Sequence, residues 1–123
     1  MQESFGKLLE LVATLRGKNG CPWDKEQTLK SLIPSITEEV EEVVHAIEAD
    51  DKENLKEELG DVLLNILLLA QIAKEAGFFE MEDVLEVVSE KIIRRHPHVF
   101  GNKKFKTSAE VLKEWAKIKK SEK

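Results

Sequence analysis

The feature that most constrains the fold is a run of twelve residues, 62–73, in which only Asn65 and Gln71 are polar. As a helix, this run would be apolar on almost every side, which is typical of a central, buried element. Other parts of the chain must then cover it. No segment of the sequence alternates polar and apolar residues over a sustained length, so no sheet is expected. We therefore predict an all-α protein.

Two helices are expected before this central run. Apolar residues recur at helical spacing over residues 5–15 and form one stripe. Residues 19–24 are predicted to be a loop, because Gly and Pro both disfavour helix. A second helix is expected over about 25–49. Pro34 lies inside it, so a kink or break is expected near Ile33.

The central helix and those that follow it have recognisable ends. Two residue pairs have the spacing of a capping box and predict helix starts: Asp50 with Glu53, and Thr107 with Glu110. The first pair starts the central helix, which is expected to end near Gly77. A fourth helix is expected over about 81–94, and the second pair opens the last helix.

These segments predict a four-helix bundle with an extra C-terminal helix, in a single domain covering residues 1–123. Hydrophobic residues make up 41% of the chain, which argues against disorder. The net charge of -5 argues against broad nucleic-acid binding. With one cysteine (Cys21), no signal-peptide pattern and no apolar run of membrane-spanning length, we expect a cytoplasmic protein.

Two acidic pairs stand at equal distances from the expected turn at Asp50. Glu39 and Glu42 lie eleven and eight residues before it, and Glu58 and Asp61 lie eight and eleven residues after it. If the helices fold back on each other, Glu39 falls level with Asp61, and Glu42 with Glu58. Two like charges about 4 Å apart repel by about 4 kcal/mol at an effective dielectric constant of 20. Four carboxylates on one patch therefore favour a bound hard cation such as Mg2+ or Mn2+.

The two acidic pairs are not equally informative. Glu-rich helices usually present solvated faces, and Glu42 lies away from the apolar stripe of its helix. Glu58, Asp61 and Asn65 instead follow one another at helical spacing and form a polar line into an otherwise apolar helix. A polar line that enters a core must be paired or functional. We therefore interpret Glu58 and Asp61 as part of a site.

Basic and aromatic residues form a second candidate group. Lys91 and Arg95 are one helical turn apart, and so are Trp115 and Lys119. A guanidinium, two ammonium groups and an indole suit a phosphate chain and a base. A solvated basic helix end and a packing role for Trp115 remain open as alternatives. Residues 96–98, with two histidines around a proline, are interpreted as a structural loop.

Several segments of the chain resemble the MazG nucleotide pyrophosphohydrolases. The first is an acidic signature, Glu38-Glu39-x-x-Glu42 followed after fifteen residues by Glu58-x-x-Asp61. The others are residues 20–28 (GCPWDKEQT), 58–61 (ELGD) and 94–100 (RRHPHVF). The resemblance covers about residues 5–119. It implies an all-α fold that works as a homodimer or higher homo-oligomer.

The resemblance also implies an activity, the Mg2+-dependent hydrolysis of nucleoside triphosphates to nucleoside monophosphate and pyrophosphate. Metal-activated water would attack the α-phosphorus. By position, the metal ligands would be Glu39, Glu42, Glu58 and Asp61, with Glu38 as an added ligand or as a base for water. The nucleotide would be bound by Lys91, Arg95, Trp115 and Lys119, with Trp23 and Asn65 as further candidates. Mn2+ is a possible substitute for Mg2+.

Two other functions remain open. The chain could be a specialist for dUTP or phosphoribosyl-ATP, which related all-α folds hydrolyse by similar metal chemistry. It could also be a non-catalytic helical regulatory or interaction module that keeps a metal-binding scaffold. The sequence contains no phosphate-binding loop of the GxxxxGKS type, so any phosphate chemistry must rely on metal ions.

Overall fold

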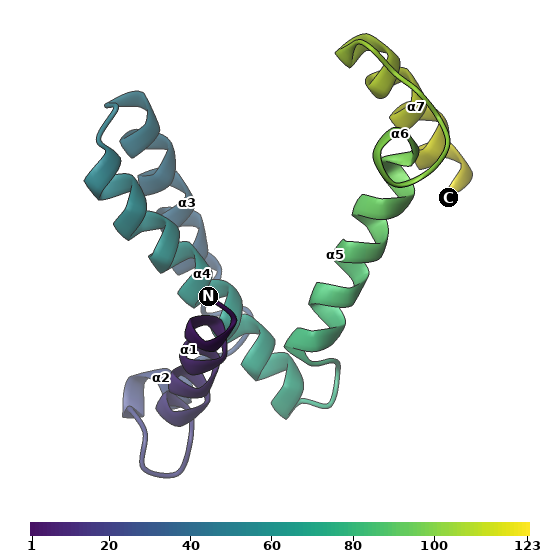
Figure 1. The fold of residues 1–123 in the computed structure, drawn as a ribbon. Coiled ribbons are helices and arrows are strands. Elements are labelled where there is room, and N and C mark those ends of the chain that lie inside the picture. Colours follow the sequence, from purple (N-terminus) through teal and green to yellow (C-terminus); the bar gives the residue numbers. More distant parts are fainter. The chain divides into compact units, whose positions relative to one another are not determined.

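The computed structural model describes all 123 residues and contains seven helices and no strand (Figure 1). The prediction of an all-α protein is confirmed. The chain divides into two compact units, residues 1–81 and 82–123. No helix combines the length and the apolar composition needed to cross a lipid bilayer.

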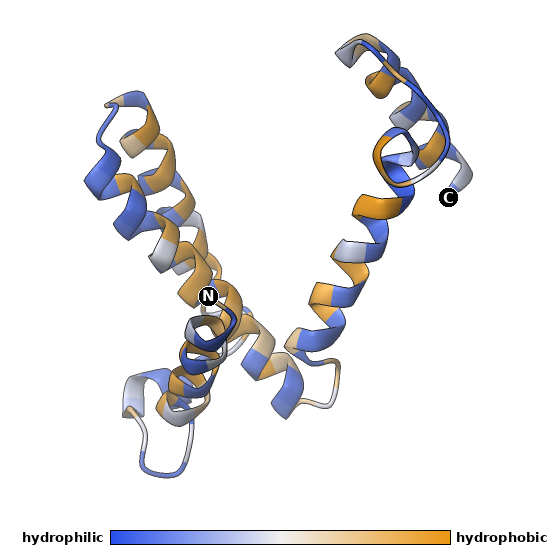
Figure 2. Cartoon of the chain, viewed as in Figure 1, coloured by the Kyte–Doolittle hydropathy of each residue, from blue (hydrophilic) through white to orange (hydrophobic).

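The first unit is built around an antiparallel pair of long helices. It contains α1 (Gln2–Leu15), α2 (Pro22–Glu26), α3 (Ile33–Glu48) and α4 (Lys52–Glu75). α3 and α1 both pack against α4, whose middle turns are coloured as hydrophobic in Figure 2. The buried core consists of Val12, Leu32, Leu67, Leu68 and Ile72. The predicted central helix is therefore present, and it supplies most of the core.

The helix predicted over about 25–49 is interrupted. The break expected near Ile33 is confirmed, but residues 27–32 before it are not helical. A short helix, α2, forms where a loop was expected, and α3 begins only at Ile33. Between them, the Thr28 N–H donates to Ser31 Oγ at 2.8 Å and the Ser31 N–H donates to Thr28 Oγ1 at 3.0 Å. These side chains give the backbone a turn in place of a helix. Pro34 then lies in the first turn of α3, where its missing N–H costs nothing.

The turn between α3 and α4 differs by one residue from the predicted capping box. Asp51, not Asp50, is the N-cap of α4, and its carboxylate accepts the Asn54 N–H at 3.1 Å. Asp50 instead has a left-handed backbone, with φ 53°. Its N–H donates to the Ile47 carbonyl, and the Asp51 N–H donates to the Ala46 carbonyl. This pair of bonds ends α3 in a pattern usually built on glycine, so one aspartate ends α3 and the next starts α4.

The C-terminal end of α4 is tied to the N-terminal segment by an ion pair. The Arg16 guanidinium donates to both Glu75 oxygens at 2.9 and 3.0 Å, and to the carbonyls of Asp24 and Gln27. The Arg16 side chain is 8% exposed and that of Glu75 is 40% exposed. The hydrogen bond from Arg16 lowers the pKa of Glu75. α4 ends at Glu75, two residues before Gly77, which has φ 78°, so the end predicted near Gly77 is confirmed.

The second unit contains α5 (Met81–Arg95), which starts at the last residue of the first unit, α6 (Pro97–Phe100) and α7 (Ser108–Ser121). The helix predicted over about 81–94 is confirmed. The second capping box is also confirmed, because Thr107 Oγ1 accepts the Glu110 N–H at 3.3 Å. A hydrogen bond from Trp115 Nε1 to the Arg95 carbonyl, at 2.6 Å, joins α7 to the end of α5.

Candidate functional site

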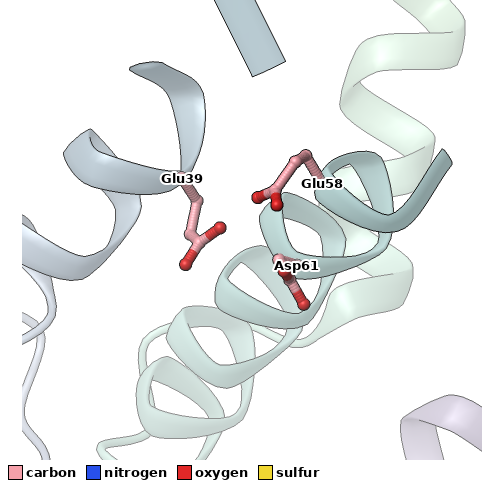
Figure 3. A group of neighbouring side chains, drawn as sticks. All are labelled: Glu39, Glu58 and Asp61. Atoms are coloured by element: carbon pink, nitrogen blue, oxygen red, sulfur yellow. The ribbon is translucent and has the colours of Figure 1, made fainter. Parts of the chain in front are cut away.

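Three carboxylates face one another across α3 and α4. Glu39 comes from α3, and Glu58 and Asp61 come from α4 (Figure 3). One carboxylate oxygen of each residue lies within 4.8 Å of the others, and all three side chains are partly buried. None of the ion pairs in the structure involves any of the three. The patch therefore concentrates negative charge without a protein cation to balance it.

The titration of Glu58 reports this uncompensated charge. Burial raises the pKa of Glu58 most, followed by a hydrogen bond with Glu39 and by the negative charges of Glu39, Asp61 and Glu42. Together they bring its pKa to about 7. A bound cation would relieve the same repulsion between the carboxylates.

Two buried oxygens in this region have no hydrogen-bond donor, Glu39 Oε2 and Asn65 Oδ1. Asn65 is 5% exposed, lies one helical turn after Asp61, and donates through Nδ2 to the Asp61 carbonyl at 3.0 Å. A buried acceptor without a donor is destabilising. The donor set of the patch consists of oxygen atoms, which Mg2+ and Mn2+ prefer. The residues present therefore fit a hard divalent cation.

Glu42 and Glu38 lie outside the three-carboxylate group. Three residues rotate a helix by about 300°, so Glu42 projects about 60° away from Glu39. Its side chain is exposed, and it acts on Glu58 through its charge. Glu38 is also exposed and forms no ion pair.

The second candidate group is brought together in the unit of residues 82–123. Lys91, Arg95, Trp115 and Lys119 all line one pocket with a volume of about 220 Å³. Ile92 and His96 complete its lining. A pocket with one indole, one imidazole and three cations suits a ligand that carries both a flat ring and negative charge.

His96 is a pocket residue that the sequence interpretation missed. Its Nδ1 lies 2.6 Å from the Ile92 carbonyl, and its ring meets the ring of Trp115 edge to face, with centroids 5.4 Å apart. Its position directly after Arg95 was the available signal. The loop expected over residues 96–98 is reduced to His96, because α6 begins at Pro97 and includes His98. The His98 ring packs on Phe105 and does not line the pocket.

Glu122 is a second residue that the sequence interpretation missed. The Arg95 Nη2 donates to Glu122 Oε1 at 2.8 Å, and the Arg94 Nε donates to Glu122 Oε2 at 2.5 Å. These bonds, Arg95 first, lower the pKa of Glu122 to about 2. An acidic residue at the end of a helix whose last turn carries Lys119 and Lys120 was the signal in the sequence.

Trp23 and Asn65 lie apart from the other predicted nucleotide-binding residues. Trp23 is on α2, is 56% exposed and does not line the pocket. Asn65 lies beside the carboxylates on α4. The acidic group and the basic pocket belong to different units of the chain.

Comparison with known proteins agrees with these observations. The model of the MazG nucleotide pyrophosphohydrolase domain matches residues 27–100. The nucleoside triphosphate pyrophosphohydrolase/pyrophosphatase MazG of Thermotoga maritima is 45% identical over 97% of this chain and 45% of its own length. The nucleoside triphosphate pyrophosphohydrolase of Escherichia coli K12 is 44% identical over 94% of this chain and 44% of its own length. The chain thus spans less than half of these curated relatives.

A solved structure matches over nearly its whole length. The crystal structure of a mazG-related protein from Thermotoga maritima has a TM-score of 0.78 and 34% sequence identity, covering 94% of this chain and 98% of that one. The helices, the facing carboxylates and the matched segment lead to one assignment. The chain belongs to the MazG nucleotide pyrophosphohydrolase domain family.

Proposed function

We propose that this chain is an enzyme that hydrolyses nucleoside triphosphates, with ribose or deoxyribose, to nucleoside monophosphate and pyrophosphate. The observation that carries this proposal is the patch of three facing carboxylates without a protein cation, found in a member of the MazG family. The names of the Thermotoga maritima and Escherichia coli relatives support it.

The acidic residues are proposed to bind Mg2+, with Mn2+ as a possible substitute. Glu39, Glu58 and Asp61 are the principal ligands, and Glu42 completes the set. The bound ion would neutralise charge on the departing pyrophosphate and lower the pKa of a water molecule. Glu38, an exposed carboxylate that forms no ion pair, is the candidate base for the water that attacks the α-phosphorus.

The pocket residues are proposed to bind the nucleotide. Lys91, Arg95 and Lys119 supply positive charge for the phosphates, and Trp115 supplies a face for stacking on the base. Stacking on a base needs no particular hydrogen-bond pattern, which favours broad base tolerance. Trp23 is a second candidate for stacking, because its ring is exposed. Asn65 is a further candidate for substrate binding through its unpartnered Oδ1.

We also propose that the enzyme is a cytoplasmic homodimer or higher homo-oligomer. Val40, Val44 and Ile47 lie at helical spacing on α3 and are 46–60% exposed, which leaves an apolar stripe uncovered. A second copy of the chain would bury it. Sedimentation velocity at micromolar concentration tests this proposal, and a strict monomer would contradict it.

The deciding experiment is a nucleotide panel. The purified chain is incubated with each of the eight common NTPs and dNTPs in Mg2+, and the products are separated and identified. We expect monophosphate plus pyrophosphate, and no turnover in EDTA. Diphosphate plus orthophosphate would contradict the proposed bond cleavage. Nucleotide binding without any product would instead favour a non-catalytic regulatory module.

The same experiment, extended to dUTP and phosphoribosyl-ATP, separates a specialist from a general enzyme. A specialist shows one kcat/KM value far above the others. A general enzyme that relies on charge and stacking is expected to show values within about a hundredfold of one another.

A further inference from the structure

One cation that lines the pocket in the second unit, Arg95, is already paired with an anion of the protein, although that anion, Glu122, is not among the lining residues. The Glu122 carboxylate bridges Arg94 and Arg95, at 2.5 and 2.8 Å, and its side chain is 22% exposed. We propose that Glu122 is a built-in competitor for the substrate's phosphate at Arg95 and thereby sets the affinity of the pocket for anionic ligands. This inference rests on the proposed nucleotide-binding role of the pocket.

Arg95 is the one pocket cation that is paired. Neither Lys91 nor Lys119 takes part in any ion pair of the structure. A guanidinium binds carboxylate and phosphate with the same planar array of donors. A phosphate group that enters the pocket can therefore use the two lysines at once, whereas at the Arg95 guanidinium it meets a carboxylate that already occupies Nη2.

The donors of Arg95 are incompletely used in this arrangement. Its Nη2 is bonded to Glu122, but its Nε is buried and has no partner. A buried donor without an acceptor is destabilising, so the present state of Arg95 is not its best possible one. A phosphate offers more acceptor oxygens than the single Glu122 oxygen that Arg95 now contacts. In the proposed exchange, a phosphate takes the place of the Glu122 oxygen at Arg95.

Glu122 does not lose its own partner in this exchange. Its other oxygen accepts from the Arg94 Nε, and Arg94 does not line the pocket. The low pKa of Glu122 means that the carboxylate is charged at every pH at which an enzyme of this kind is assayed. The competitor is therefore always present, and a ligand without negative charge gains nothing by displacing it.

The structure offers a matched control for the test. Glu90 also pairs with Arg94, at 3.2 Å, but does not contact Arg95. Glu122→Gln and Glu90→Gln change the net charge equally and remove the same chemical group from the neighbourhood of Arg94. Only the first releases Arg95. A difference in pyrophosphate affinity between the two variants therefore reports competition at Arg95. It does not report the loss of one negative charge near the pocket, because both variants share that loss.

The experiment measures the binding of inorganic pyrophosphate in EDTA by isothermal titration calorimetry, with wild type, Glu122→Gln and Glu90→Gln. We expect Glu122→Gln to lower Kd about fivefold, the scale of one partly exposed ion pair, and Glu90→Gln to change it by less than about twofold. Weaker binding by Glu122→Gln would show that Glu122 positions Arg95 instead. Equal effects in both variants, an unchanged Kd in Glu122→Gln, or no binding by any of the three would also overturn the proposal.

Two further measurements keep the result interpretable. Thermal melting shows whether Glu122→Gln remains folded. If it does not, Glu122→Asp replaces it, because this variant keeps the charge and shortens the side chain by one methylene. Glu122→Asp is expected to tighten pyrophosphate binding by a smaller factor. Unchanged or weaker binding by this folded variant overturns the proposal. Pyrophosphate release from nucleotides in Mg2+ is assayed separately, so a wild type that binds pyrophosphate but releases none would contradict the proposed function and not this inference.

Discussion

The two ends of α4 carry glutamates in opposite electrostatic situations. Glu58, near the N-terminal end, faces Glu39 and Asp61 with no protein cation, and its pKa rises to about 7. Glu75, the last residue of the helix, faces Arg16, and its pKa falls. The two residues are seventeen positions apart, which is about 25 Å along the helix.

This contrast leads to different expectations for the two residues, because Glu75 stabilises the fold and Glu58 is proposed to bind a metal ion. Arg16 donates to Glu75 and also to the Asp24 and Gln27 carbonyls, so the charges of this ion pair are compensated by the chain itself. The Glu58 patch is compensated by nothing in the chain. Under the proposed function, a bound cation supplies this compensation. The same substitution, Glu to Gln, should therefore have opposite effects at the two ends.

The largest expected effect is on turnover. Glu58→Gln or Asp61→Asn should reduce kcat/KM for nucleoside triphosphates by at least about a hundredfold, or ~2.7 kcal/mol, because the metal loses a charged ligand. Steady-state kinetics measures this loss, and circular dichroism should show unchanged helical content. Activity near wild type in both variants would remove these residues from the site.

The matched substitution, Glu75→Gln, should act on stability instead. It leaves a guanidinium that is 8% exposed without its counter-charge, and we expect a loss of about 2 kcal/mol in the free energy of unfolding. Urea denaturation measures this loss. Catalytic constants should stay within about threefold of wild type below the transition. A large loss of activity in Glu75→Gln with unchanged stability would contradict the assignment of Glu75 to the fold.

Metal binding should distinguish the same variants. At ten times its dissociation constant, Mg2+ should stabilise the wild type by about 1.4 kcal/mol, because it binds the folded state alone. Glu75→Gln should keep this stabilisation, and Glu58→Gln should lose most of it. Urea denaturation in Mg2+ and in EDTA provides the measurement. Equal stabilisation of both variants would place the cation elsewhere.

In EDTA, the free energy of unfolding should fall at both ends of the pH range, at high pH because of Glu58 and at low pH because of Glu75. The pKa of Glu58 is raised in the folded state, so its contribution is present below about pH 4.5 and is lost as the pH rises through about 7. The pKa of Glu75 is lowered, so its contribution is present above about pH 4.5 and is lost as the pH falls. Melting temperatures measured from pH 3.5 to 8 test this. Glu58→Gln should no longer show the decrease at high pH, and Glu75→Gln should no longer show the decrease at low pH. Solvent screening keeps both effects small.

The smallest expected effect concerns Asn65. Asn65→Leu removes a buried oxygen without a donor and should raise the free energy of unfolding by up to about 1 kcal/mol. If Asn65 also binds substrate, KM should rise in the same variant. Chemical denaturation and steady-state kinetics on one preparation check both results. A destabilised variant with normal KM would assign Asn65 to packing alone.

Local signals in the sequence predicted much of the fold. The apolar run around Leu67, the glycine at 77 and the capping pair at Thr107 each act within a few residues, and the structure agrees with all three. The segment around Thr28 was predicted wrongly, because paired side-chain bonds outweighed its helical pattern. Asp50 and Asp51 are chemically identical, so sequence spacing could not decide which one caps α4.

Helical periodicity predicts which residues of one helix share a face, and only this part of the candidate site could be predicted from the sequence. The pattern anticipated that Glu39 would meet Asp61, but the separation of Glu42 depends on how α3 is rotated against α4. The four residues that the family resemblance grouped together share one pocket, although their spacing alone related only Lys91 to Arg95 and Trp115 to Lys119. The link from Arg95 to Glu122 joins positions 27 residues apart, and such a contact follows from tertiary packing alone.

The turn at Asp50 and Asp51 sets the register between α3 and α4, and therefore the geometry of the acidic patch. Backbone hydrogen bonds of these two aspartates end α3, and the Asp51 carboxylate caps the start of α4. Inserting one residue after Asp51 would rotate every following side chain of α4 by about 100°. Glu58 and Asp61 would then turn away from Glu39, although every acid would still be present. In protein engineering terms, the length of this turn is as much a part of the site as the carboxylates, and grafting the acidic motif onto another hairpin would have to carry the turn with it.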